Sequence, residues 1–123
     1  RVVAIFQDRE GGLWFGANQR LGRYDGQNWT WFTAEDGLSQ GGFVTSIFQD
    51  QDGYLWFGVW RGAGGISRYD GKTFTTFTEK DGAPSGGVTR ICQDRAGHFL
   101  VVSRSVDPVR GPGPWTTLVC EPV

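Results

Sequence analysis

The sequence predicts an all-β protein in which one module is copied along the chain. The dipeptide Gln-Asp occurs as Gln7-Asp8, Gln49-Asp50 and Gln93-Asp94, at spacings of 42 and 44 residues. The motifs Leu-Trp-Phe-Gly and Arg-Tyr-Asp-Gly each occur twice, at spacings of 42 and 45 residues, because the connection between them is three residues shorter in the first copy. Glycine provides 20 of the 123 residues and divides the chain into short segments rich in Trp, Phe, Thr and Val. Such segments are typical of strands joined by tight turns, and the fixed period indicates a repeated unit.

The second copy defines the strands most clearly. We expect them at residues 43–49, 54–59, 66–69 and 73–78. Residues 50–53 form a turn, residues 60–65 a flexible loop, and Asp70-Gly71 a two-residue hairpin, because Asp and Gly tolerate a positive φ. No window of 11 or more residues has the apolar 3.6 period of a helix. Four antiparallel strands in about 44 residues match one blade of a β-propeller.

The chain is therefore expected to be one propeller segment, residues 1–123, with three blades at about 1–42, 43–87 and 88–123. The third copy matches at first and then departs from the pattern, with three prolines among residues 108–114 where the hairpin should be. Proline cannot sit in a central strand because it donates no ladder hydrogen bond. We expect a third blade that is irregular at its outer edge or partly disordered, with residues 115–119 as a candidate fourth strand.

Composition excludes several classes of function. The net charge of −1, from 12 basic and 13 acidic residues, provides no basic face for nucleic acid. No apolar run reaches the roughly 18 residues that cross a bilayer, and no targeting signal is visible. Cys92 and Cys120 would lie about three strands apart in one blade, too far for a disulfide, so two free thiols are expected.

The residues that recur in each copy are expected to have structural roles. Trp14 and Trp56 should pack as wedges between neighbouring blades, because burying one indole removes ~150–250 Å² from water. Asp8, Asp50 and Asp94 should accept amide hydrogens in the first turn of each blade. Two recurrent arginines then have acidic neighbours within reach.

Arg23 and Arg68 are those arginines, and each could pair with one of these Asp residues, which would again be a structural role. Residues 50–53 resemble the start of a calcium loop, but the further ligands of an EF-hand are missing, so a plain turn is favoured and no metal is expected. His98, the single histidine, has no Ser or Cys partner at a suggestive spacing, so a catalytic histidine is not expected.

The motifs at residues 5–16 and 21–26, repeated at 47–58 and 65–71, resemble the two-component regulator propeller repeat. With a half match in the third copy, the resemblance covers roughly residues 2–97. This repeat is found in sensor domains of bacterial hybrid histidine kinases and in related ligand-binding propellers. The resemblance implies a toroidal β-propeller and a periplasmic or extracellular ligand sensor. The chain itself has no kinase, receiver or membrane segment.

A ligand is expected on the face that carries the loop between the second and third strands, because the copies differ there. The candidate ligand-binding residues are Asn18, Gln19 and Arg20 in the first copy, Trp60 and Arg61 in the second, and Arg104 in the third. A Trp beside several Arg residues can stack on a sugar or clamp a carboxylate or phosphate. The alternative is that Trp60 packs on its own blade and the arginines are solvated.

Three blades cannot close a ring of the usual ~4–8. The chain is then either a fragment of a longer propeller or a self-associating protein. A homodimer with six blades is favoured, and a homotrimer follows if the third copy does not form a blade.

The expected function is a non-catalytic recognition module for a small polar ligand or a glycan, with no cofactor. The alternatives are a protein–protein interaction scaffold and, less favoured, a propeller lyase, since such chemistry needs a general base and often a metal.

Overall fold

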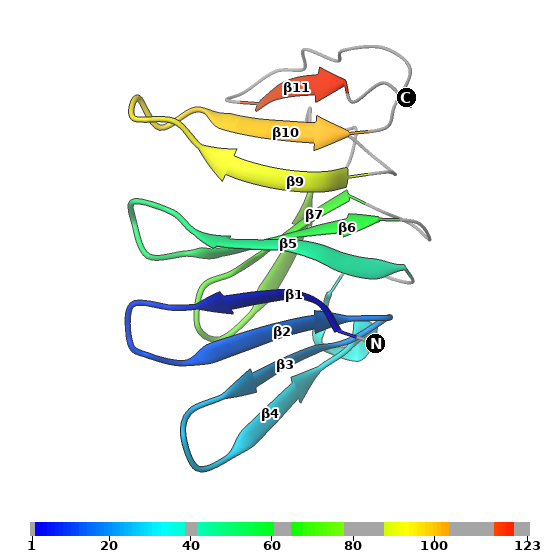
Figure 1. The fold of residues 1–123 in the computed structure, drawn as a ribbon, viewed down its shortest axis with the longest axis vertical. Coiled ribbons are helices and arrows are strands. Elements are labelled where there is room, and N and C mark those ends of the chain that lie inside the picture. Colours follow the sequence, from blue (N-terminus) through cyan, green and yellow to red (C-terminus); the bar gives the residue numbers. More distant parts are fainter. Residues whose placement is uncertain (1, 39–41, 61–64, 78–87, 104–114, 120–123) are drawn as a thin grey trace.

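A computed structural model describes residues 2–38, 42–60, 65–77, 88–103 and 115–119, which form three β-sheets stacked side by side (Figure 1). The strands and the one 3₁₀ helix in this part of the chain are β1 Val2–Gln7, β2 Leu13–Ala17, β3 Leu21–Tyr24, β4 Trp29–Phe32, η1 Ala34–Asp36, β5 Phe43–Gln49, β6 Leu55–Trp60, β7 Gly65–Tyr69, β8 Phe74–Phe77, β9 Val88–Gln93, β10 Phe99–Ser103 and β11 Trp115–Val119. The all-β prediction is confirmed.

The first two sheets are copies of each other. Both are antiparallel, with the orders β1-β2-β3-β4 and β5-β6-β7-β8. Gln7 pairs with Leu13 in one sheet and Gln49 pairs with Leu55 in the other, so the repeated motifs share a register. Gly53, at φ 93°, adopts in the β5–β6 turn the left-handed conformation that side chains disfavour. The short helix η1 was not expected; a capping box between Thr33 and Asp36 holds it.

The third sheet has the order β11-β10-β9. The strand β9 pairs antiparallel with β10, as the repeat predicts. The strand β11, expected as a fourth strand, instead pairs with β10 and runs parallel to it, with Phe99 opposite Trp115. A parallel pair requires a crossover rather than a hairpin, and the hairpin motif is missing from the segment between these strands.

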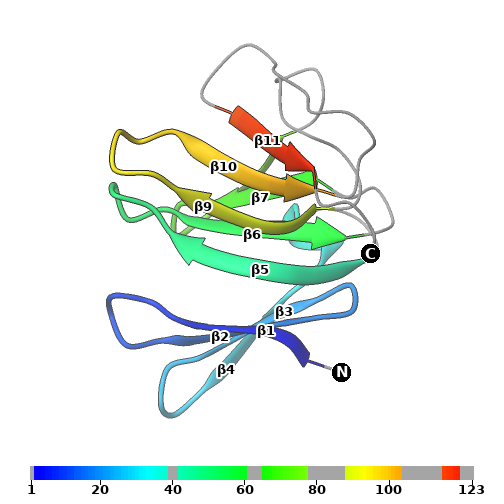
Figure 2. The same cartoon turned by 45° about the horizontal axis from the view of Figure 1, so that its top comes forward.

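The sheets pack through their first strands and through aromatic side chains. The strand β5 packs against β1 on one side and against β9 on the other (Figures 1 and 2). Trp14 is 1% exposed, and its ring centroid lies 5.4 Å from that of Phe57 in the second sheet. Trp56 is 3% exposed and lies 4.5 Å from Phe99 in the third. The two tryptophans are wedges between blades, as predicted.

Candidate functional site

Asp8 organises the turn between β1 and β2. Its Oδ1 accepts the backbone N–H groups of Glu10 and Gly12 at 3.0 and 2.8 Å. Its Oδ2 accepts Nε1 of Trp14 at 2.8 Å and Nε of Arg23 at 3.0 Å. The predicted role of this Asp as a turn acceptor is confirmed, and the same carboxylate also fixes the wedge indole.

Asp50 repeats the arrangement in the second sheet. Its Oδ1 accepts the backbone N–H groups of Asp52 and Tyr54, each at 2.9 Å, and its Oδ2 accepts Nε1 of Trp56 at 2.7 Å. Both oxygens therefore have donors, as a plain turn requires. In the third sheet Asp94 accepts two turn amides in the same way.

The two recurrent arginines behave differently. Arg23 pairs with Asp8, with Nη2 and Oδ2 3.0 Å apart, as predicted. Arg68 was expected to pair with one of the turn Asp residues, and this prediction is wrong. Within the described ranges Arg68 forms no ion pair, and its guanidinium lies 5.0 Å from the ring centroid of Tyr54.

The residue two positions before the wedge tryptophan explains why the two arginines have different partners. In the first copy it is Gly12, and a Cβ there would come within 2.2 Å of the Arg23 guanidinium. In the second copy it is Tyr54, whose side chain occupies that space. Arg23 can therefore cross the backbone to Asp8, whereas Arg68 stacks on the tyrosine ring.

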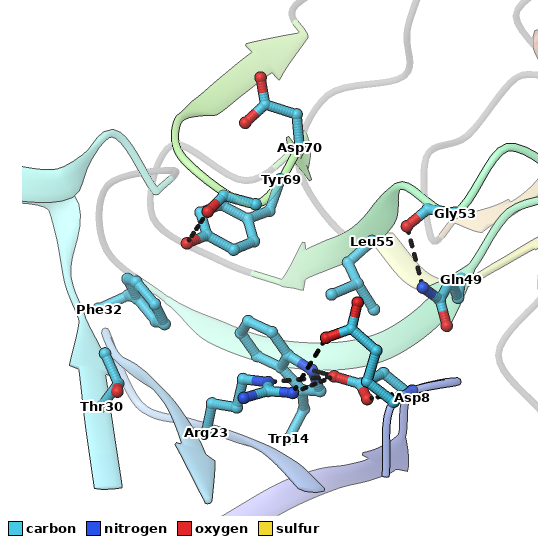
Figure 3. A pocket seen from close by; sticks show the side chains of 12 residues that line it. Asp8, Trp14, Arg23, Thr30, Phe32, Gln49, Gly53, Leu55, Tyr69 and Asp70 are labelled. Atoms are coloured by element: carbon cyan, nitrogen blue, oxygen red, sulfur yellow. Dashed lines mark hydrogen bonds and ion pairs between the residues drawn. The ribbon is translucent and has the colours of Figure 1, made fainter. Parts of the chain in front are cut away.

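A cleft of about 310 Å³ lies between the first and second sheets, at the end where β1 joins β2 and β3 joins β4 (Figure 3). We call it the first cleft. Its aromatic walls are Trp14, Phe32 and Tyr69, and its polar groups include Arg23 and Thr30. The other residues that line it are Asp8, Glu10, Gln49, Gly53, Leu55, Asp70 and Gly71.

An equivalent second cleft lies between the second and third sheets and has the same volume, about 310 Å³. Asp50, Trp56 and Arg68 line it at the positions that Asp8, Trp14 and Arg23 occupy in the first. The two clefts differ because Tyr54 lines the second, whereas the first has Gly12 at that position. The first cleft is thus the one in which an Arg–Asp pair, rather than an Arg–Tyr stack, lies beside the wedge indole.

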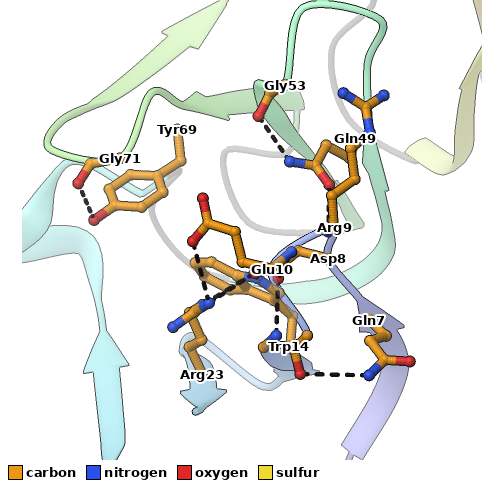
Figure 4. A network of polar contacts seen from close by, with 12 residues as sticks. Gln7, Asp8, Arg9, Glu10, Trp14, Arg23, Gln49, Gly53, Tyr69 and Gly71 are labelled. Atoms are coloured by element: carbon orange, nitrogen blue, oxygen red, sulfur yellow. Dashed lines mark hydrogen bonds and ion pairs between the residues drawn. The ribbon is translucent and has the colours of Figure 1, made fainter.

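The charges of the first cleft are mostly negative. Asp8, Glu10 and Asp70 contribute carboxylates, and Arg23 contributes the single cation among its lining residues. Burial raises the pKa of Asp8, but the hydrogen bonds from Trp14, Arg23 and the Gly12 amide outweigh it, so the pKa is lowered from 3.8. The Glu10 side chain is 86% exposed, and its Oε2 lies 3.9 Å from Arg23 (Figure 4).

Tyr69 presents a neutral hydroxyl to this cleft. Burial, together with the nearby negative charge of Asp70, raises its pKa above 10.0. Its hydroxyl donates to the backbone oxygen of Gly71 at 3.0 Å. A bound ligand would therefore meet a polar rim with hydrogen-bonding groups of both kinds over aromatic walls.

Among the ligand candidates that the sequence predicts, those that the structure describes lie at the opposite end of the sheets. Asn18, Gln19 and Arg20 form the exposed β2–β3 turn, where the Arg20 guanidinium lies 4.6 Å from the ring centroid of Trp31. Asn18 bridges to Phe43, and Gln19 donates its backbone N–H to the oxygen of Gly42 at 2.7 Å.

Trp60 was expected in a flexible loop, but it is the last residue of β6. It is half-buried, its backbone pairs with Phe43, and the two ring centroids lie 6.5 Å apart. This contact favours packing on its own blade. Arg61 and Arg104 lie outside the described residues. Asn18 and Trp60 therefore both adjoin Phe43, whereas the Arg20 guanidinium lies over Trp31.

The lining of the first cleft was not predicted as a ligand site. Asp8, Trp14 and Arg23 were read as structural residues because they recur. Glu10 and Gly12 could have pointed to the site from the sequence alone, because they differ from their counterparts Asp52 and Tyr54 in the second copy.

In the described part of the chain, few side chains point to a metal site, a catalytic histidine or a reactive cysteine. Its Asp, Glu, His and Cys side chains form no group of three that could hold a metal ion. The His98 side chain is 62% exposed and lies 3.4 Å from Asp94 through Nδ1. Cys92 is an exposed free thiol, and Cys120 lies outside the described residues. No helix among these residues is long and apolar enough to cross a membrane.

The fold and the repeated motifs define a β-propeller module. The two-component regulator propeller family matches the chain over residues 1–19 and 37–61, which include the first two strands of the first and second sheets. These segments are two-component regulator propeller repeats, and the resemblance inferred from their motifs is confirmed. No curated protein matches the chain.

Proposed function

We propose that the chain is a non-catalytic recognition module that binds a small polar ligand, such as a sugar unit of a glycan, in the first cleft. The difference between the two clefts at Gly12 and Tyr54 carries this proposal. Both clefts follow from the packing of repeated blades, so a cleft alone needs no ligand to explain it. What distinguishes the first cleft is that Gly12 stands where Tyr54 lines the second.

The lining of the first cleft suits such a ligand. Aromatic faces pack against the apolar face of a sugar ring, and carboxylates with an arginine bind hydroxyl groups at its edge. The cleft volume of about 310 Å³ is at the lower limit of typical small-molecule sites. We therefore expect one or two sugar units rather than a long chain.

A thermal-shift screen with neutral, acidic and amino sugars and their short oligomers tests the proposal. A ligand at 100 times its Kd stabilises the folded protein by about 2.7 kcal/mol, which raises Tm by several degrees. Hits are then measured by calorimetric titration. A screen without any hit, in a protein shown to be folded, would contradict ligand recognition.

The substitution Gly12→Tyr should weaken binding of a hit at least tenfold, because it introduces the residue that the second blade tolerates at this position. Glu10→Gln and Thr30→Ala, at exposed residues of the same cleft, provide variants with little risk to folding. Trp60→Ala is the matched variant at the opposite end. If Trp60→Ala abolished binding while Gly12→Tyr had no effect, the ligand would bind at the face originally predicted.

The second candidate function is an interaction scaffold. One observation favours it: Trp29 and Trp31 are 47% and 46% exposed on the first sheet, although large aromatic residues are usually covered. The enzyme hypothesis receives no comparable support from the described residues.

A further inference from the structure

The first sheet has an uncovered apolar face. Ile5, Trp29 and Trp31 lie on it and are 66%, 47% and 46% exposed. We call these three residues the free face. The two indoles stack, with centroids 5.2 Å apart and ring planes 6° from parallel.

The repeat identifies what covers such a face. In the second sheet Ile47 and Phe74 occupy the positions of Ile5 and Trp29. Both are partly buried and pack into the cluster that contains Trp14 of the first sheet. The same surface is thus covered by a preceding blade in the second sheet and uncovered in the first.

A polar contact accompanies each junction between sheets. The backbone N–H of Arg9 donates to Oε1 of Gln49 at 2.9 Å, and that of Gln51 donates to Oε1 of Gln93 at 3.0 Å. Arg9 also donates through Nη2 to the backbone oxygen of Asp50 at 2.5 Å. Each junction therefore pairs a turn N–H of one sheet with the Gln side chain of the next.

The first and third sheets lie at the two ends of the stack. The first has the Gln acceptor of this hydrogen bond, and the third has the turn N–H donor. Gln7 donates through Nε2 to the oxygen of Gly11, but its Oε1 accepts no hydrogen bond from the described residues and points away from them (Figure 4). The backbone N–H of Arg95 likewise has no acceptor among those residues. Arg95 occupies in the third copy the position that Arg9 occupies in the first, and both residues are arginines.

Cys92 marks the corresponding apolar surface of the third sheet. It occupies the position of Phe6 and Phe48, which pack against the sheet that follows their own. Cys92 itself is exposed. Within the part of the chain that the structure describes, the third sheet therefore has no neighbour on this side, unlike the first two sheets.

We propose that the free face of one copy binds the third sheet of a second copy, head to tail. The Arg95 N–H then donates to Oε1 of Gln7 in the other copy, and the Arg95 guanidinium reaches the backbone oxygen of Asp8, as Arg9 reaches Asp50. The occupant is a second copy because this chain carries both halves of the contact. Head-to-tail contacts close into rings when the rotation permits, and two copies supply six blades, within the usual ~4–8.

Size-exclusion chromatography with light scattering tests the proposal on the full chain, over about 1 to 100 μM protomer, a range that detects associations with micromolar Kd. The expected species has twice the 13.6-kDa protomer mass. Ile5→Asp should weaken association at least tenfold, because it places a charge in an apolar contact. Gln7→Ala and Arg95→Ala should each weaken it about fivefold, as expected for one hydrogen bond. Gln27→Ala, at an exposed turn, is the control.

Cross-linking identifies the contacting surfaces. Leu13 has the register position of Phe99, whose ring lies 6.1 Å from that of Phe48, the counterpart of Cys92. A Leu13→Cys variant in a Cys120→Ser background should therefore form covalent dimers with a short bismaleimide. The same variant with Cys92→Ser should not.

A protein that remains a folded monomer at 100 μM would overturn the proposal. So would an oligomer that Ile5→Asp, Gln7→Ala and Arg95→Ala leave unchanged. An oligomer that lacks the cross-link between Cys92 and the Leu13→Cys thiol would also overturn it, since its contact would lie elsewhere.

Discussion

Asp8 is the residue on which most of the first blade's polar structure depends. One carboxylate accepts two turn amides, an indole N–H and a guanidinium, and the residue is 8% exposed. A buried charge is stable only when it is paired and hydrogen-bonded, and here both conditions are met. The recurrence of Asp in all three copies follows from the turn, and the recurrence of Trp six residues later follows from the same carboxylate.

Replacing Asp8 by Asn should lower the free energy of unfolding at pH 7 by about 3 kcal/mol, the lower limit for a broken buried pair, because Arg23 remains partly hydrated. The pKa of Asp8 is lowered on folding, so its stabilising effect is complete above the unfolded value near 3.8 and is lost as pH falls through the lowered value. The difference between wild type and variant should therefore shrink below about pH 4. Urea unfolding from pH 7 to 2.5 measures it.

Asp94→Asn is the matched control, because Asp94 caps the same turn with a side chain that is 38% exposed. It should cost less than Asp8→Asn at neutral pH. If the two variants were equally destabilised, or if the effect of Asp8→Asn did not change with pH, the ionised network would not be the source of stability.

At the scale of elements, the blades are held together by the first strands, the wedge indoles and the turn-to-turn hydrogen bonds. The Gln49 side chain forms one hydrogen bond between sheets and another within its own turn. Its Oε1 accepts from Arg9 in the first sheet, and its Nε2 donates to the oxygen of Gly53 in its own turn, both at 2.9 Å. The Gln49 side chain thus fixes the position of the first blade's turn relative to the second blade's turn.

Gln49→Ala should lower the free energy of unfolding by about 1–2 kcal/mol, since it removes two hydrogen bonds and leaves the Arg9 amide without its acceptor. Chemical denaturation measures the change. Gln27→Ala, which removes an exposed amide, should stay within about 0.5 kcal/mol of wild type. Equal effects of the two substitutions would mean that the contact between turns adds nothing to stability.

The elements could be predicted wherever local motifs determine them. Residues 43–49 were predicted as a strand and are β5, because a segment rich in β-prone residues is followed by an Asp-Gly turn. The place of β11 could not be predicted, because it pairs with β10 across a segment that lacks hairpin residues. Pairing of that kind depends on contacts distant in sequence, which a repeat pattern does not contain once the repeat is broken.

The candidate site was predictable only in part for a similar reason. The substitution of Gly12 by Tyr54 between copies is visible in the sequence, but its effect is not. Only the geometry reveals that the glycine lets Arg23 cross to Asp8, whereas Arg68 stacks on the tyrosine. The sequence directed attention to the loops at the other end because their lengths vary, although the cleft is formed by residues that recur.

At the scale of the whole molecule, three sheets form an arc whose two ends differ from its interior. Interior junctions combine a buried indole with a turn-to-turn hydrogen bond, as at Trp14 and Gln49. The first end exposes the apolar free face and the Oε1 of Gln7. Solvent at these surfaces leaves part of the stabilising contact unmade, so the arc should gain stability whenever a blade covers its ends.

Head-to-tail association therefore predicts that thermal stability depends on protein concentration. A partner that binds only the folded chain stabilises it by mass action, so Tm should rise by several degrees between about 1 and 100 μM protomer. Ile5→Asp should abolish this dependence and leave the Tm of the dilute protein nearly unchanged, because Ile5 is 66% exposed in the isolated chain. Calorimetry of wild type and variant at both concentrations measures it. A wild-type Tm that is the same at the two concentrations would mean that the ends of the arc remain in water.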